Sequence, residues 1–201
     1  MDFLIQPAPA APVVGILPGS FHPVTRAHVA LAQAGLSVVD TVVFAMPRHF
    51  PHKTYEQVGL AARLEIVKAA VAHEPRFAVA VADGGLFIEM AREFRAGFPI
   101  ADVWMMCGRD AAERICGWSY SGLPIEEQLR EYGLLVAARH GEFAAPDHLA
   151  GRIRTLGIEA GWDDVSATEV RSRIACGLDW ESLVPEVAVE LVRRHYASSS
   201  P

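Results

Sequence analysis

Short apolar runs alternate along this chain with longer segments of helical spacing. The apolar runs have the length of strands: Val13–Leu17, Thr41–Met46, Phe77–Ala82, Asp102–Cys107 and Leu134–Ala138. Between them, apolar residues recur at helical intervals: Thr25–Gly35, Gln57–His73, Leu86–Arg95 and Ala111–Ile115. Nearly every position of the strand-length runs is apolar, as in parallel strands that helices cover on both faces. The alternation therefore predicts a doubly wound α/β domain with a mainly parallel sheet.

The two ends of the chain differ from this pattern. Residues 1–12 are rich in Pro and Ala, and we expect them to form a flexible N-terminal lead-in. Residues 13–196 are expected to form a single domain, whose last part, 157–196, is a small helical portion. The helices predicted in that portion are Thr168–Cys176, which ends at the C-cap Gly177, and Pro185–Tyr196. Residues 197–201 are expected to be a frayed tail.

The composition argues against some broad classes of protein. The chain has 201 residues, of which 51% are hydrophobic, so it can bury a sizeable core and is not expected to be disordered. It carries 24 acidic residues against 18 Lys and Arg, and its net charge is -6. This balance disfavours a general nucleic-acid binder, although it allows a local cationic pocket for a phosphorylated small molecule.

The cysteines and the N-terminal stretch indicate a cytoplasmic protein. Cys107, Cys116 and Cys176 are odd in number and scattered, so we expect reduced thiols and no disulfide framework or zinc site. The uncharged stretch Phe3–Phe21 lacks a preceding basic region and is interrupted by prolines, which argues against a signal peptide or a membrane span. We expect a soluble protein that binds neither membranes nor nucleic acid. Whether it forms a homo-oligomer stays open.

The first candidate site lies where the first apolar run ends. That run passes into Pro18-Gly19, a turn that lets backbone approach a ligand, and a helix begins near Thr25. The unpaired N–H groups at a helix N-terminus favour a phosphate, and His28 in the first turn can point to the same anion. The dinucleotide motif G-x-G-x-x-G and the P-loop motif are absent from the sequence. The alternative is that His28 merely caps an ordinary surface helix.

The second candidate site lies near the end of the chain. Ser166 is followed three residues later by Glu169, a capping box that predicts the start of a helix. Thr168 would lie in its first turn and Arg171 one turn further on. A hydroxyl, unpaired N–H groups and a guanidinium would then meet at one place, as a polyphosphate requires. The alternative is a plain capped helix on the surface.

The two sites together resemble a known pair of signatures. GSFHPVTRAH, which ends at His28, and VSATEVRSRI, which contains Arg171, are similar to the signatures of the T/HxGH nucleotidyltransferase superfamily. Within it, the chain from about Val13 to Tyr196 resembles the bacterial nicotinate-mononucleotide adenylyltransferases. Intermediate landmarks resemble that family in order and spacing: Pro51-His52-Lys53 followed by Arg63, Gly108-Arg109-Asp110 followed by Trp118, Leu134–Arg139, and Leu183-Val184-Pro185.

The resemblance implies a Rossmann-like fold and a reaction in NAD biosynthesis. A phosphate, favoured to be that of nicotinate mononucleotide, would attack the α-phosphate of ATP and release pyrophosphate without a covalent enzyme intermediate. The implied catalytic residues are His28, Thr25 and Arg171. The implied ATP-binding residues are Gly19, Ser20, Phe21, His28, Lys53, Gly108, Asp110, Ser166, Thr168 and Arg171. The implied acceptor-binding residues are Phe87, Trp118 and Arg139. Mg²⁺ would be bound mainly through the ATP phosphates, with no residue assigned to a metal.

Several positions depart from the family pattern and keep alternatives open. In the first signature Pro18, His22, Thr25 and Ala27 replace the commonest residues, and Pro18-Gly19 with Thr25 is closer to phosphopantetheine adenylyltransferases. Phe87 and Met90 stand where the nicotinate-mononucleotide adenylyltransferases usually have Thr residues associated with the acceptor. One alternative is therefore adenylyl or cytidylyl transfer to another phosphate acceptor, such as phosphopantetheine. Another is a nucleotide-binding homologue with reduced catalysis. Donor preference for ATP over CTP also stays open.

Overall fold

The computed structural model describes residues 1–7, 11–49, 58–117, 122–137, 143–158, 161–162 and 164–197. Within them the strands form one sheet in the order β1-β4-β3-β2-β5-β6-β7. The strands are β1 Asp2–Ile5, β2 Val13–Pro18, β3 Thr41–Pro47, β4 Phe77–Ala82, β5 Asp102–Gly108, β6 Gly133–Ala137 and β7 Ile153–Leu156. All pairs are parallel except β1 with β4. The predicted mainly parallel sheet is confirmed.

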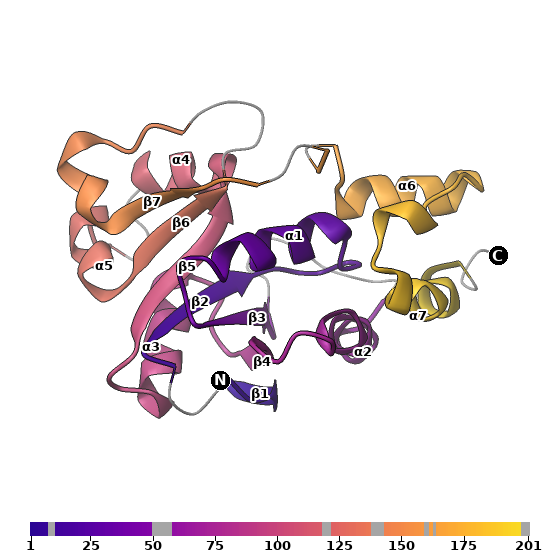
Figure 1. Ribbon diagram of the computed structural model, residues 1–201, viewed down its shortest axis with the longest axis horizontal. Helices are drawn as coiled ribbons and strands as arrows, with labels where there is room; N and C mark the ends of the chain where they lie inside the picture. Colours follow the sequence, from indigo (N-terminus) through magenta and orange to yellow (C-terminus); the bar gives the residue numbers. More distant parts are fainter. Residues whose placement is uncertain are drawn as a thin grey trace.

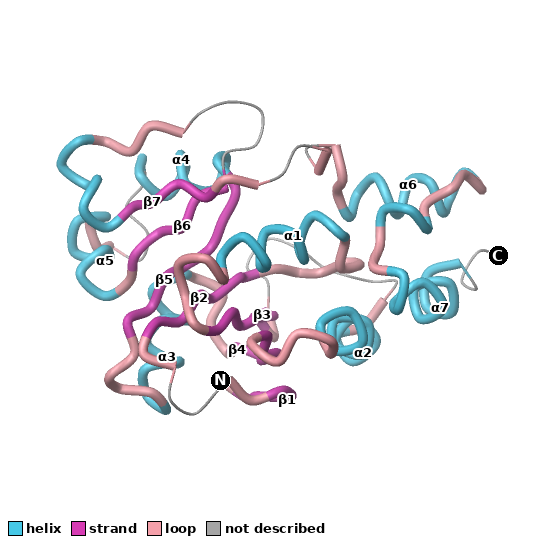
Figure 2. The backbone as a smooth tube through the Cα atoms, in the orientation of Figure 1, coloured by secondary structure: helices cyan, strands magenta, loops and turns pink. Residues whose placement is uncertain are grey.

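Helices cover both faces of this sheet (Figures 1 and 2). The helices are α1 Arg26–Gly35, α2 Leu60–Val71, α3 Phe87–Gly97, α4 Arg109–Gly117, α5 Ile125–Glu131, α6 Ala167–Cys176 and α7 Val189–Val192. One core layer joins α1, α2 and the C-terminal portion to the sheet, and a second joins α3, α4 and α5 to its opposite face. Because residues facing both layers are buried, β3, β4 and β6 have no solvent-facing position. This is the doubly wound arrangement that the apolar runs predict.

The strand order contains a reversal between β2 and β5. From β2 the chain moves to β3 and β4 on one side, and the later strands β5, β6 and β7 extend to the other side. Open α/β sheets bind ligands at the carboxyl ends of the strands that flank such a reversal. Pro18 and Gly108, the last residues of β2 and β5, therefore mark where a ligand is expected.

The expected flexible lead-in 1–12 is wrong for Asp2–Ile5, which form β1 against β4. The aromatic ring of Phe3 packs edge-on against Phe94 and Phe98 of α3, with centroid distances of 6.0 and 5.7 Å. Exposed and half-buried residues alternate along β1, as in an edge strand with one covered face. The apolar contacts made by that face explain why Asp2–Ile5 form a strand.

The C-terminal portion lies at one end of the molecule, with α6 and α7 far from β7 and α5 (Figure 1). Gly177 ends α6 in the left-handed conformation, with φ of 66°, which confirms the predicted C-cap. The predicted continuous helix Pro185–Tyr196 is instead a 3-10 turn at Glu186–Ala188, then α7, then a π-helical turn at Arg193–Ala197. No helix in the part of the chain described is long and apolar enough to cross a membrane. Of the expected frayed tail 197–201, only Ala197 is described.

Candidate active site

The loop between β2 and α1 is tightly folded. The Gly19 N–H donates to the Ala45 carbonyl of β3 at 3.0 Å, which continues the sheet by one residue. A Cβ at Gly19 would come within 2.7 Å of the Phe21 ring, so this position requires glycine while Phe21 stays where it is. Phe21 itself has a positive φ of 41°, and the peptide bond between His22 and Pro23 is cis. The Phe21 side chain is buried, so only its backbone can face a ligand.

His28 is held in a defined orientation at the start of α1. Thr25 is the N-cap residue, and its backbone N–H donates to Nδ1 of His28 at 3.0 Å. The Thr25 hydroxyl oxygen also lies 2.8 Å from Nδ1, and the Phe21 ring packs edge-on against the imidazole at 5.2 Å. Because Nδ1 accepts the backbone bond, a neutral imidazole must carry its proton on Nε2. His28 therefore caps the helix through Nδ1, and in its neutral form it carries the ring proton on Nε2.

The second helix start meets the first at the same loop. Ser166 caps α6 by accepting the Glu169 N–H at 3.1 Å, which confirms the predicted start of this helix. Arg171 donates from one terminal nitrogen to the His22 carbonyl at 2.5 Å and from the other to the Thr168 hydroxyl at 3.3 Å. The two signatures, far apart in the sequence, are thus joined by a direct hydrogen bond.

Two buried side chains hold the His22 end of this loop. The His22 ring is 6% exposed, and its Nδ1 lies 2.6 Å from the Tyr196 hydroxyl in the last helical turn. Burial, with the positive charges of Arg171 and Arg63, lowers the pKa of His22 to about 4. Arg63, which is 4% exposed on α2, donates to the Ser20 carbonyl at 2.8 Å. His22 is therefore neutral at physiological pH and fixes the loop to the C-terminal portion.

A cavity of about 510 Å³ opens beside His28 at the carboxyl ends of β2 and β5. Its wall contains Leu17, Pro18, His28, Phe87, Cys107, Gly108, Arg109, Asp110 and Arg114, with Leu31, Met106 and Ala111. The Arg109 guanidinium in this wall lies 3.4 Å from the Glu113 carboxylate. Burial raises the pKa of Cys107 to about 12, so this thiol is no nucleophile at neutral pH. The cavity occupies the position expected from the reversal in strand order.

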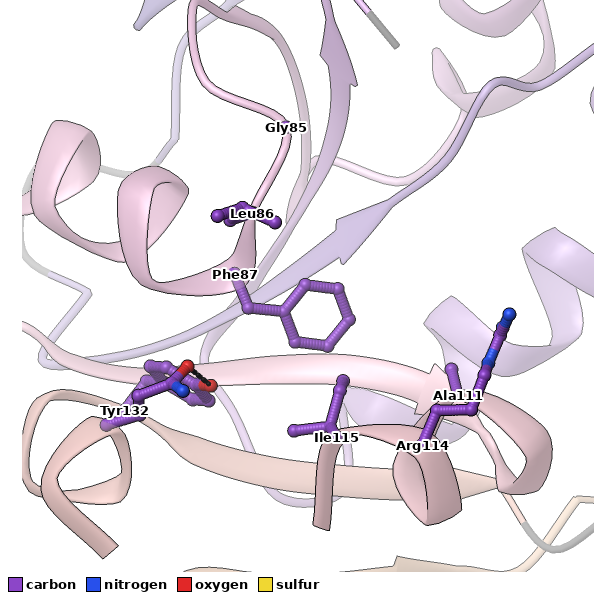
Figure 3. A pocket seen from close by; sticks show the side chains of 8 residues that line it. Gly85, Leu86, Phe87, Ala111, Arg114, Ile115 and Tyr132 are labelled. Atoms are coloured by element: carbon purple, nitrogen blue, oxygen red, sulfur yellow. Dashed lines mark hydrogen bonds between the residues drawn. The ribbon is translucent and has the colours of Figure 1, made fainter. Parts of the chain in front are cut away.

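A smaller cavity of about 190 Å³ adjoins the first (Figure 3). Phe87, Ala111 and Arg114 line both cavities. The walls of the smaller one are otherwise Gly85, Leu86, Ile115, Gln128 and Tyr132. In Figure 3 the Phe87 ring projects toward Ile115, with Tyr132 on one side and Arg114 on the other. The lining is mainly apolar and suits a flat ring.

The structure places most of the predicted site residues near this region. His28, Gly108, Asp110 and Phe87 line the main cavity. Thr25 orients His28, and Arg171 bonds the His22 carbonyl of the loop that also contains Gly19, Ser20 and Phe21. Ser166 and Thr168 lie at the start of the same helix as Arg171, and Thr168 accepts a hydrogen bond from it. Lys53, Trp118 and Arg139 lie outside the described residues.

Other residues of the site were not among those predicted. Arg63 was a landmark of the family resemblance but was assigned no role in the site, and the structure shows that it is buried on α2 and bonds the loop. Tyr196 and Arg114 have no motif that points to a site. In the described residues, no group of three or more His, Cys, Asp and Glu side chains could hold a metal ion.

A family profile described as Cytidylyltransferase-like matches residues 16–173. This span includes both helix starts and both cavities, and the chain belongs to this family, a class of nucleotidyltransferases. A protein of Neisseria meningitidis serogroup B named "Probable nicotinate-nucleotide adenylyltransferase" is 29% identical over 201 aligned residues, covering 90% of this chain and 96% of that protein. A protein of the same name from Thermus thermophilus is 27% identical and covers 90% of this chain and 97% of its own.

Solved structures share the fold. The nicotinic acid mononucleotide adenylyltransferase of Plasmodium falciparum, solved in complex with NaAD, superimposes with a TM-score of 0.68 at 14% sequence identity. The match covers 90% of this chain and 95% of that one. A second structure, described as a putative nicotinate-nucleotide adenylyltransferase from Vibrio parahaemolyticus, gives a TM-score of 0.63 at 14% identity, covering 93% of this chain and 96% of that one. These likenesses confirm the Rossmann-like nucleotidyltransferase fold.

Proposed function

We propose that this enzyme transfers AMP from ATP to the phosphate of nicotinate mononucleotide and releases pyrophosphate, a step of NAD biosynthesis. The observation that carries the proposal is the hydrogen bond from Arg171 to the His22 carbonyl, which brings the starts of α1 and α6 to one loop beside the cavity. The names of relatives that align over nearly the whole chain support the reaction.

In the proposed reaction an oxygen of the acceptor phosphate forms a bond to the α-phosphorus of ATP. The bond from that phosphorus to the bridging oxygen breaks, and pyrophosphate leaves with the electron pair. No side chain needs to form a covalent bond, so catalysis consists of positioning and of stabilising the charge on the phosphates. His28 suits this role because its Nε2–H donor is fixed by the Nδ1 bond to Thr25.

Arg171, Thr168 and Ser166 would hold the β- and γ-phosphates. The described residues occupy three of the five N–H donors of Arg171, two on one nitrogen and one on the other, which leaves two donors for an anion. The Thr168 side chain is exposed at the start of α6, where the helix dipole favours negative charge. ATP would enter as its Mg²⁺ complex, with the ion bound mainly through the phosphates.

The departures in the first signature are compatible with activity. The Ala27 side chain is 1% exposed and packs in the core, so its methyl group does not narrow the cavity. His22 is neutral and bonded to Tyr196, which gives it a structural role in the loop. We therefore favour an active enzyme over a homologue with reduced catalysis. We also propose that it acts in the cytoplasm.

A screen of pyrophosphate release tests this proposal. ATP and CTP are each combined with nicotinate mononucleotide, nicotinamide mononucleotide and phosphopantetheine, in the presence of Mg²⁺. We expect the highest kcat/KM for ATP with nicotinate mononucleotide. Turnover of phosphopantetheine alone would support the second acceptor class, which Pro18-Gly19 and Thr25 suggest. ATP binding without release from any combination would contradict catalysis altogether.

A further inference from the structure

We propose that Arg114 binds the negatively charged ring substituent of the acceptor and thereby selects a pyridine carboxylic acid over the corresponding amide. The inference rests on the proposed function and assigns this specificity to a residue of α4. Arg114 stands at the boundary of the two cavities, because it lines both the space beside His28 and the smaller apolar one.

The polar contacts that Arg114 makes to described residues leave its terminal nitrogens for a ligand. Its Nε donates to the backbone carbonyl of Asp110, one turn earlier, at 3.2 Å. Among the described residues, no carboxylate lies within ion-pair distance of Arg114. Arg109, the other arginine of the larger cavity, differs because it lies 3.4 Å from the Glu113 carboxylate and 4.0 Å from that of Asp110. Within the described part of the chain, Arg114 is thus a cation at this boundary whose charge no carboxylate offsets.

The smaller cavity accepts the ring but contains no other charge among its described lining residues. The Tyr132 hydroxyl donates to the Gln128 side-chain oxygen at 3.0 Å, and the Gln128 amide nitrogen donates to the Leu123 carbonyl at 2.9 Å. Those polar atoms are therefore bonded within the protein. Phe87 and Ile115 provide apolar walls across the space from each other (Figure 3). A ring placed here would depend on Arg114 for recognition of an anionic substituent.

The shape of the acceptor allows its carboxylate and its phosphate to bind at different places. The ring nitrogen that bears the ribose and the carbon that bears the acid are meta to each other, so both substituents can face the mouth of the smaller cavity. The ribose and phosphate then extend into the larger cavity toward His28, while the carboxylate stays beside Arg114. A planar guanidinium matches a carboxylate with two parallel hydrogen bonds, whereas a neutral amide lacks the charge and one acceptor.

The test compares kcat/KM for nicotinate mononucleotide and for nicotinamide mononucleotide in Arg114→Gln. We expect the value for the acid to fall by about 10- to 100-fold, the range for a charged hydrogen bond, with the value for the amide nearly unchanged. Arg114→Lys keeps the charge without the planar fork and should retain part of the preference. Arg130→Gln is the matched control, because Arg130 is also an exposed arginine on a short helix. It lines a different cavity, which includes Asp102 at the start of β5, so its replacement should leave both kcat/KM values unchanged.

The outcomes separate the inference from the proposed function. An equal loss for both mononucleotides in Arg114→Gln would mean that Arg114 contacts the shared phosphate or supports the fold, and would overturn the inference. An unchanged ratio with unchanged rates would overturn it as well. In both cases wild-type turnover of the acid would leave the proposed function standing. If the wild-type enzyme released no pyrophosphate with either mononucleotide, the proposed function itself would fail.

Discussion

Replacing His28 by Asn separates the two roles of this side chain, the capping of α1 and the donation of a hydrogen bond to a phosphate. Nδ1 accepts the Thr25 backbone N–H at 3.0 Å and caps α1, and the side chain lines the cavity, where Nε2 would serve as the phosphate donor. The amide oxygen of an asparagine can take the place of Nδ1, but its side chain is too short to reach the position of Nε2. His28→Asn should therefore keep the cap and lose the phosphate donor, whereas His28→Ala loses both.

The structure sets the magnitude of each effect. Loss of one preorganised donor to a developing charge costs about 3 kcal/mol, so turnover should fall at least about a hundredfold in both variants. Loss of the cap costs about 1 kcal/mol, which lowers Tm by roughly 2–4 °C in a chain of this size. We expect that decrease in His28→Ala and a smaller one in His28→Asn.

Pyrophosphate release with saturating ATP and nicotinate mononucleotide measures the first effect, and thermal unfolding measures the second. His28→Gln is a further control, because its longer amide reaches the Nε2 position but cannot accept the Thr25 N–H in the same way. It should recover part of the turnover at a lower Tm. Near-normal turnover in His28→Asn would refute the assignment of Nε2 as the phosphate donor.

Two further predictions concern stability. Folding lowers the pKa of His22 from 6.5 to about 4, so between these pH values the unfolded chain binds more protons than the folded one. The contribution of neutral His22 to the free energy of unfolding should therefore be complete above about pH 6.5 and be lost as the pH falls toward 4. This loss should amount to at most about 3 kcal/mol. The free energy of unfolding measured with urea should depend less on pH in His22→Asn than in the wild type. The same dependence on pH in both proteins would contradict this. A Cβ at Gly133 would lie 2.4 Å from the Trp104 ring, whereas one at Gly151 meets open space. Gly133→Ala should therefore lose about 1–3 kcal/mol in thermal unfolding, and an equal loss in Gly151→Ala would argue against overpacking as the cause.

The buried elements of the fold could be predicted from the sequence because their signal is local. The central strands are apolar along their whole length, and the predicted bounds of β4, Phe77–Ala82, match the structure at both ends. The edge strands gave no such signal. In β7, Arg154 and Thr155 are exposed between two buried residues, so neither an apolar run nor strict alternation marks the strand. The short helix α5 was missed as well, since its seven residues are mostly polar.

In the candidate site, too, the features with a local sequence signal could be predicted and those that depend on long-range contacts could not. The first helix start was predicted from the turn that follows the apolar run, and the second from a capping box. The structure confirms that each helix begins there. The contact between His22 and Tyr196 joins residues that are 174 positions apart in the sequence, so no local sequence pattern predicts it. The same holds for Arg114, which becomes significant only because α4 packs beside Phe87 and forms the boundary of two cavities.

A crystal structure of the enzyme with a non-hydrolysable ATP analogue and Mg²⁺ would examine the arrangement of the phosphates directly. We predict one triphosphate that accepts hydrogen bonds of about 3 Å from His28 Nε2 near its α- and β-phosphates and from Arg171 near its β- and γ-phosphates. A triphosphate bound outside the cavity between β2 and β5, or one that contacts neither side chain, would contradict the assignment of this loop as the nucleotide site.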